Sequence, residues 1–268
     1  MYRKVTSIML ISLGLALAGC GPAPQAASTT LTVFAAAALT AAFTDMGKEF
    51  EAMYPNTTVI FNFGASNQLA EQINQGAPAD IFASANKTQM LAAIDSGRIV
   101  SGTQQTFVKN RLVVIFPTDN PASVSTLQDL AKPGLKLILA AKEVPVGQYS
   151  LDFLDKAIQD TAFGATFKDD VLKNVVSYEE NVKAVFSKVA LGEADAGIVY
   201  TSDVTGDGAD KVSRLDIPES LNTIASYPIA TLNDSANADL AKAFVEFVLS
   251  QPGQDILAKY GFIPAAQK

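Results

Sequence analysis

Short strand-like runs alternate with helix-like runs along almost the whole chain from residue 31 onward. The run LTVFAA (31–36) is apolar and rich in strand-forming residues, and segment 39–54 repeats apolar residues at helical spacing. An alternation of this kind favours an α/β protein with parallel strands and helices on both faces of the sheet. Strongly apolar strands begin again at Arg111, which indicates two sheets of modest size rather than one very large sheet.

The later elements follow the same pattern. Further strands are expected at 58–63, 80–85, 111–117, 136–141, 174–178, 196–200 and, as an extended segment, 224–232. Helices are expected at 66–76, 87–96, 147–159, 182–192 and 239–249. Pro228 lies inside the last extended segment and has no N–H group for a sheet ladder. Its position predicts a sheet edge or a crossover.

The N-terminal segment is typical of an exported lipoprotein. Two basic residues are followed by an apolar run, 8–17, and then by LAGC, which resembles a bacterial lipobox and ends at the sole cysteine, Cys20. We expect a lipoprotein signal peptide at 1–20, a lipid anchor on Cys20 and a flexible tether at 21–30. A plain signal peptide with a chance cysteine is the alternative.

Composition excludes several functional classes. The chain has no histidine, which rules out a Ser-His-Asp triad made from this chain alone. Its net charge of −7 is a poor match for nucleic acid. Ser84 and Lys87 form an S-x-x-K pattern, but no S-D-N or K-T-G follows, so a lipid-anchored hydrolase is disfavoured. Asp203 to Gly208 is similar to a calcium loop without its final glutamate and is interpreted as a solvated turn.

Four strand-to-helix junctions share one style. They are FAAAALT (34–40), FNFGASNQ (61–68), EVPVGQY (143–149) and SYEENVK (177–183). Helix N-termini present free N–H groups and partial positive charge, so they can hold an anion without a cationic side chain. The alternative is that these junctions are ordinary helix starts that bind nothing.

Several motifs occur together in a characteristic order. They are TVFAAAALT (32–40), GAPADIFASA (76–85), EVPVGQY (143–149), ENV (180–182) and AGIVYTSD (196–203). In combination they resemble the molybdate-binding proteins of bacterial molybdate ABC importers, over residues 31–262. The resemblance implies a two-lobed type II periplasmic-binding-protein fold, with a tetrahedral oxyanion between the lobes. It also implies a monomeric, non-catalytic protein without a cofactor, whose partner is an ABC importer permease.

The resemblance also implies a set of ligand-binding residues. They are Ala38, Ser66, Val146, Val182 and Tyr200. Val146 and Val182 would contribute backbone N–H groups, and Ser66 and Tyr200 would contribute hydroxyls. Ala38 stands where the family pattern has a serine, so a hydroxyl donor is missing there unless Thr40, a water or another N–H replaces it.

The lobes are expected at 31–110 plus 228–268 and at 111–227, with hinge crossings at Arg111 and near Tyr227. Glu179 and Glu180 are expected to organise their loop rather than touch a dianion, which they would repel. Ser66→Ala and Tyr200→Phe should weaken binding with little loss of stability.

The hydrogen-bonding capacity of each candidate anion narrows the choice of ligand. Molybdate and tungstate only accept hydrogen bonds near neutral pH, whereas monohydrogen phosphate carries a proton that would meet another donor. Leaving a buried group unpaired costs about 1–3 kcal/mol. Sulfate has suitable chemistry but is smaller, so a receptor for sulfate is the alternative. The sequence does not separate tungstate from molybdate.

Overall fold

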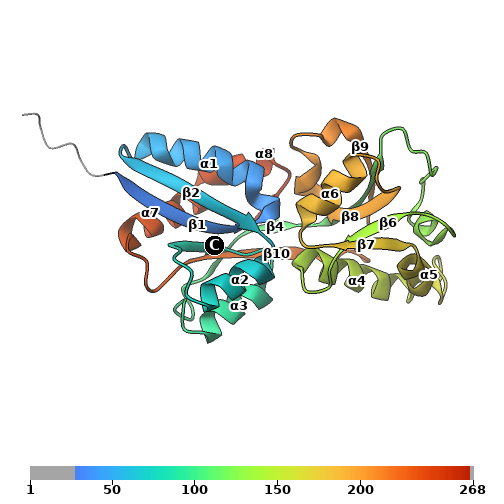
Figure 1. Ribbon diagram of the computed structural model, residues 1–268, viewed down its shortest axis with the longest axis horizontal. Helices are drawn as coiled ribbons and strands as arrows, with labels where there is room; N and C mark the ends of the chain where they lie inside the picture. Colours follow the sequence, from blue (N-terminus) through green and yellow to red (C-terminus); the bar gives the residue numbers. More distant parts are fainter. Residues whose placement is uncertain (1–27, 266–268) are drawn as a thin grey trace, which may run out of the picture.

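Two β-sheets lie side by side in the computed structural model, which describes residues 28–265, and helices cover both faces of each sheet (Figure 1). The expected α/β fold with two modest sheets is confirmed. The predicted signal peptide (1–20), the predicted lipid anchor on Cys20 and residues 21–27 of the predicted tether lie outside the described residues. The last part of the tether prediction (21–30) is wrong, because Thr29 and Thr30 already belong to the first strand.

The first sheet takes its strands from both ends of the described chain. In spatial order they are β11 (Ile263–Pro264), β4 (Gln105–Asn110), β10 (Ala225–Thr231), β3 (Ile81–Ala83), β1 (Thr29–Ala36) and β2 (Thr57–Gly64). β1 pairs in parallel with β2 and β3, whereas β10 runs antiparallel to β3 and β4.

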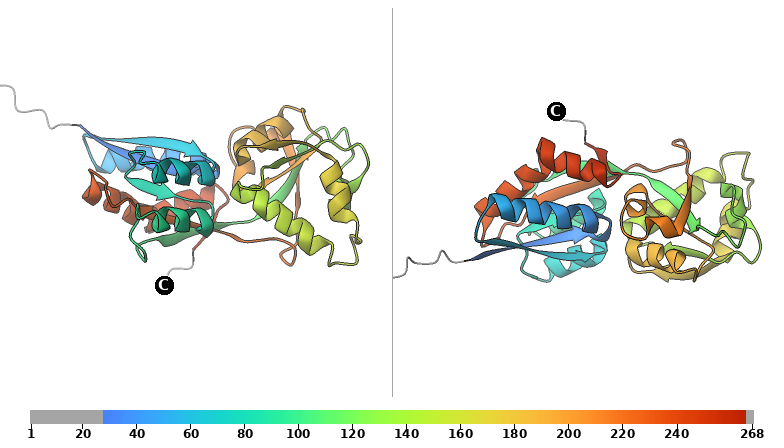
Figure 2. Two further views of the ribbon diagram at one scale, coloured as in Figure 1. Left: turned by 60° about the horizontal axis from the view of Figure 1, so that its bottom comes forward. Right: turned by 90° about the horizontal axis from the view of Figure 1, so that it is seen from above.

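The second sheet is built from the middle of the chain. In spatial order its strands are β7 (Val175–Glu179), β6 (Leu137–Ala140), β8 (Ala196–Tyr200), β5 (Leu112–Pro117) and β9 (Val212–Asp216). Within residues 28–265, the chain enters this sheet between Asn110 and Leu112 and returns to the first sheet between Asp216 and Ala225 (Figure 2).

The expectation of parallel sheets is wrong for part of each sheet. β6 pairs in parallel with β7 and β8, but β5 runs antiparallel to β8 and β9. A parallel neighbour needs a crossover connection, usually a helix. β5 follows β4 of the first sheet, and β10 follows β9 of the second sheet, with no helix between them. Neither strand therefore enters its sheet through a helical crossover from a neighbouring parallel strand.

The helices form layers on the two sheets. On the first sheet, α1 (Thr40–Met53), α7 (Ala238–Leu249) and α8 (Gln251–Lys259) lie together on one face, and α2 (Ser66–Asn74) and α3 (Lys87–Asp95) lie on the other (Figure 1). On the second sheet, α6 (Val182–Ala190) lies opposite α4 (Pro145–Ala157) and α5 (Phe167–Lys173) (Figure 1). Two short 3-10 turns matter for the site: η1 (Ala37–Leu39) and η3 (Thr201–Val204).

Aromatic packing shows why α1 forms where the apolar spacing predicts it. Phe43 and Phe50 are fully buried on its inner face. The ring of Phe43 packs against Phe61 of β2 and Phe107 of β4, with centroids 6.1 and 5.8 Å away, and both phenylalanines pack against Phe244 of α7. Burying each of these side chains stabilises the fold by roughly 1.5–3 kcal/mol.

Pro228 lies in the interior of the first sheet, so the prediction of a sheet edge is wrong. β10 is paired on both sides, by β3 and β4, and its register shifts between Tyr227 and Pro228. A bulge of this kind accommodates a residue without an N–H group. The alternative of a crossover agrees with the structure, because β10 carries the chain back into the first sheet.

The sequence pattern missed β4, β9, β11, α5 and α8. β4 (QTFVKN) and β9 (VSRLD) mix polar and apolar residues over only six and five positions, and α5 has seven residues. Periodicity is a weak signal over such lengths. Pairing with neighbouring strands decided β4 and β9, and packing against α4 decided α5. In the described part of the chain, no helix is long and apolar enough to cross a membrane.

Candidate functional site

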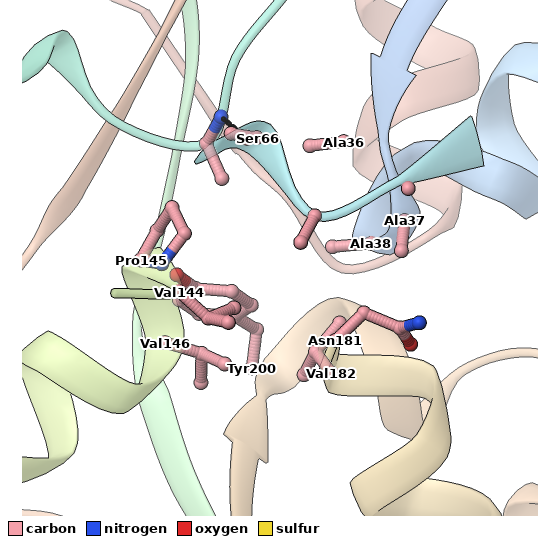
Figure 3. Close-up of a pocket in the computed structure, with 13 residues that line it drawn as sticks. Ala36, Ala37, Ala38, Ser66, Val144, Pro145, Val146, Asn181, Val182 and Tyr200 are labelled. Atoms are coloured by element: carbon pink, nitrogen blue, oxygen red, sulfur yellow. Dashed lines mark hydrogen bonds between the residues drawn. The ribbon is translucent and has the colours of Figure 1, made fainter. Parts of the chain in front are cut away.

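A small cavity lies where helix starts from the two sheets face each other (Figure 3). Its volume is about 20 Å³. A single water needs roughly 10–15 Å³ by this measure. The cavity therefore suits one compact ion and is too small for an organic ligand.

All five residues named by the sequence line this cavity. Ala38 and Ser66 come from elements of the first sheet, and Val146, Val182 and Tyr200 come from elements of the second. The other lining residues are small, apolar or amide-bearing: Ala36, Ala37, Gly64, Ala65, Ala85, Val144, Pro145 and Asn181. None of these thirteen residues has a side chain that is charged at neutral pH.

The backbone N–H groups at the cavity come from four helix starts. η1 begins at Ala37, α2 at Ser66, α4 at Pro145 and α6 at Val182, and each start lines the cavity. The first N–H groups of a helix have no partner within it, and the helix dipole adds partial positive charge at that end. Convergence of such ends makes an anion site without a cationic side chain.

The Ser66 hydroxyl already has one fixed partner. Its oxygen accepts a hydrogen bond from the N–H of Ala85, at 2.9 Å, and the residue is buried. A hydroxyl can accept and donate at once, so its proton remains free to be donated toward the cavity. Ser66 is the first residue of α2 rather than its N-cap, which is Ala65, so a capping role does not account for it.

The Tyr200 hydroxyl is buried in the described structure and has no hydrogen-bond partner there. Such groups are uncommon in native proteins, and each one calls for an explanation. Burial, and then the neighbouring Tyr227, raise the pKa of Tyr200 well above its usual value. The group therefore stays protonated and can donate a hydrogen bond at neutral pH.

Ala38 places its backbone at the cavity but brings no hydroxyl. Thr40 does not replace it, because the Thr40 hydroxyl donates to the carbonyl of Ala37, at 2.7 Å, and Thr40 is not among the lining residues. The remaining sources of a donor are the N–H groups of η1 or a water.

Gly147 explains how the start of α4 reaches the cavity. The helix begins two residues earlier than expected, at Pro145, so Val146 lies in its first turn. A Cβ atom at position 147 would lie 2.1 Å from the carbonyl oxygen of Ala141 and 2.5 Å from that of Ala140. Only glycine lets the helix start this close to the end of β6.

The acidic residues near the site are held away from the cavity. Glu179 binds Lys188 and Ser177, each at 2.6 Å, and does not line the cavity. Partial burial opposes its ionisation, but the Lys188 ammonium and the Ser177 hydroxyl outweigh that effect and hold the pKa of Glu179 below its usual value. The expectation that Glu179 organises its loop agrees with these contacts.

Asn181 is a lining residue that the sequence reasoning missed. It is the N-cap of α6, and its Oδ1 accepts a hydrogen bond from the N–H of Ala184 at 3.0 Å. Asparagine directly before an amphipathic helix is a recognised capping signal, so the sequence did contain a clue to its position. Its cap leaves the N–H of Val182 at the open end of the helix.

The two weaker motifs have structural explanations. The Ser84 hydroxyl is fully buried and donates to the carbonyl of Asn86, so it is not an exposed nucleophile. The interpretation of Asp203 as part of a solvated turn is wrong: it is buried, lies 3.0 Å from the Lys183 ammonium and accepts the Tyr200 N–H. No group of three or more potential metal ligands occurs in residues 28–265.

The chain belongs to the bacterial extracellular solute-binding proteins, whose family model matches residues 31–263. Proteins of this family bind solutes for ABC importers outside the cytoplasm, so the predictions of a non-enzyme without a cofactor are confirmed.

One curated relative is the molybdate-binding protein ModA of Mycobacterium tuberculosis H37Rv, 35% identical over 96% of this chain and 95% of its own length. Two solved structures share the type II binding-protein fold at 19% identity. The molybdate-binding protein of Azotobacter vinelandii has a TM-score of 0.75 and covers 88% of this chain and 99% of its own. The sulfate-binding protein SubI of M. tuberculosis H37Rv has a TM-score of 0.78 and covers 89% and 88%.

Proposed function

We propose that this protein captures molybdate, and with it tungstate, and delivers the anion to an ABC importer permease. The observation that carries the proposal is the cavity: helix N-termini from both sheets and the hydroxyls of Ser66 and Tyr200 converge on it, without a carboxylate among its lining residues. The sequence identity of 35% with a molybdate-binding relative, over 96% of this chain, supports the same ligand.

The donor set favours a fully deprotonated dianion. The backbone N–H groups and the Tyr200 hydroxyl can donate, and the Ser66 oxygen is already used as an acceptor by Ala85. A protonated oxyanion would bring one more donor and find no free carboxylate to accept it. That mismatch costs about 1–3 kcal/mol for a buried group, which disfavours monohydrogen phosphate.

The proposed binding residues are Ala38, Ser66, Val146, Val182 and Tyr200, with Asn181 positioning the start of α6. Two lobes, one around each sheet, would close over the anion. Because donors come from both sheets, the anion would bind the closed state better than the open one, and only such differential affinity can shift the equilibrium. We further propose that the protein is a monomer, held at the membrane through a lipid on Cys20.

The proposal is tested by titration calorimetry of a protein that lacks residues 1–20. Molybdate, tungstate, sulfate and phosphate are the titrants. We expect molybdate and tungstate to bind tightly, sulfate more weakly and phosphate not measurably. Sulfate is the second candidate because a sulfate-binding protein shares the fold. Tighter binding of sulfate than of molybdate would contradict the proposal and favour the sulfate alternative.

A further inference from the structure

Asn110 is a fully buried polar side chain at the point where the chain leaves the first sheet. It is the last residue of β4, and Leu112 already belongs to β5 of the second sheet. Buried polar side chains are costly unless they are hydrogen-bonded, so the partners of Asn110 indicate what the fold uses it for.

The Asn110 side chain joins residues of both sheets. Its Oδ1 accepts from the N–H of Arg111 at 3.0 Å and from the hydroxyl of Thr201 at 2.8 Å. Its Nδ2 donates to the hydroxyl oxygen of Ser202 at 2.8 Å and lies 3.5 Å from the hydroxyl of Tyr227. The amide group is thus satisfied at both ends, and most of its partners lie beyond its own strand.

Two of these partners come directly after a cavity residue in the sequence. Thr201 and Ser202 open η3, immediately after Tyr200, which lines the cavity. Tyr227 lies on β10, by which the chain returns to the first sheet, and its ring meets that of Tyr200 edge-on at 5.9 Å. The Asn110 amide therefore contacts the first crossing at Arg111, the strand β10 that the second crossing leads into, and the segment that follows Tyr200.

We propose that Asn110 is a positioning residue that ties the cavity end of β8 to the first crossing between the sheets and to β10, so that its hydrogen bonds stabilise the anion-bound, closed arrangement. This inference rests on the proposed function. Rotation of one sheet against the other would move Thr201 and Ser202 relative to Asn110. An open state that lengthens these bonds leaves buried polar groups unpaired, which disfavours opening.

The measurable consequence is a change in affinity without contact to the ligand. If the closed state becomes less populated, the apparent dissociation constant rises by the same factor. We expect the effect chiefly in the dissociation rate, since the bonds resist opening of the loaded protein.

Asn110→Ala and Thr201→Val test the inference from the two ends of one hydrogen bond. Thr201→Val removes the hydroxyl but keeps the branched shape, so it should fold even if Asn110→Ala does not. We expect each variant to weaken molybdate binding by about five- to tenfold and to speed release by a similar factor. Calorimetry and stopped-flow release measure the two quantities.

Asn174→Ala is the matched control. Asn174 is also a buried asparagine, and its Nδ2 donates to the carbonyls of Leu130 and Lys132 at 2.8 Å, but all three residues belong to the part of the chain around the second sheet. Thermal unfolding of each ligand-free variant measures the loss of stability. The control should lose stability and keep the wild-type affinity and release rate.

The outcomes separate the two proposals. Wild-type affinity and release in Thr201→Val, or effects in Asn174→Ala equal to those in Asn110→Ala, would overturn the role of Asn110 while leaving the proposed function intact. Failure of the wild-type protein to bind any of the oxyanions would overturn both.

Discussion

The two hydroxyl-bearing residues of the cavity differ in what the folded chain requires of them. The Ser66 oxygen accepts the buried N–H of Ala85, whereas the Tyr200 hydroxyl has no partner in the described structure. The sequence predicted that both could be changed with little loss of stability. The structure corrects this for Ser66, because its removal leaves a buried N–H group unpaired.

Tyr200→Phe should therefore be the cleaner test of the site. We expect about a tenfold loss of molybdate affinity with an unchanged thermal midpoint, since no protein hydrogen bond is lost. Ser66→Ala should weaken binding and also destabilise the protein by about 1–3 kcal/mol. Calorimetry and thermal unfolding on the same samples separate these effects. Unchanged affinity in both variants would remove the two residues from the site.

Ala38 is the position at which this chain departs from the pattern that it resembles. Its Cβ is buried at the cavity, and Thr40 does not supply the missing hydroxyl. Ala38→Ser should therefore strengthen molybdate binding by roughly five- to tenfold, the usual value of one added hydrogen bond. Calorimetry against the parent chain checks this. An unchanged or lower affinity would mean that an N–H group or a water already fills the place, or that the cavity has no room for the hydroxyl.

At the scale of elements, the start of α4 shows how packing against a strand positions a helix N-terminus at the cavity. Gly147 allows the helix to begin against the carbonyl oxygens at the end of β6, and this places Val146 at the cavity. The sequence predicted the helix and the small residue at its start. It did not predict the contact with β6, because that contact depends on strand and helix packing.

Gly147→Ala should disturb both stability and binding. The added Cβ would overlap backbone atoms, so α4 must shift, at a cost of about 1–3 kcal/mol or more. The N–H of Val146 would move with the helix, and molybdate affinity should fall. Gly206→Ala is the control, since its Cβ would meet only Ala41, at an ordinary 3.9 Å. Equal effects of the two substitutions on affinity would contradict the role given to Gly147.

At the scale of the whole molecule, the two sheets are joined by two crossings in residues 28–265 and meet again at the cavity. η1, from the first sheet, contacts both α6 and η3, from the second. An anion between them adds contacts to both sides at once. The observed arrangement is therefore the one that a bound dianion would stabilise.

Molybdate should make the protein both more stable and more compact. At a free concentration of one hundred times the dissociation constant, binding adds about 2.7 kcal/mol, which should raise the thermal midpoint by roughly 5–10 °C for a chain of this size. Small-angle scattering should show a smaller radius of gyration with molybdate than without. A higher midpoint with an unchanged radius would mean that the anion binds without closing the lobes.

The sequence by itself determined the alternation of elements, the presence of two sheets and the strand-to-helix junctions that contain Ala38, Ser66, Val146 and Val182. These features depend on local periodicity and on small residues at junctions, which can be read over a few positions. All five binding residues were identified as such only through resemblance to a family, since none of these residue types marks a site on its own.

Only the tertiary structure decided the rest. The antiparallel entry of β5 and β10, the place of Pro228 inside a sheet and the burial of Asp203 follow from contacts between residues far apart in the chain. The same is true of the Ser66 bond to Ala85 and of the Asn110 contacts with η3 and β10. Burial and hydrogen-bond satisfaction are set by which distant groups pack together, and local spacing carries no information about that.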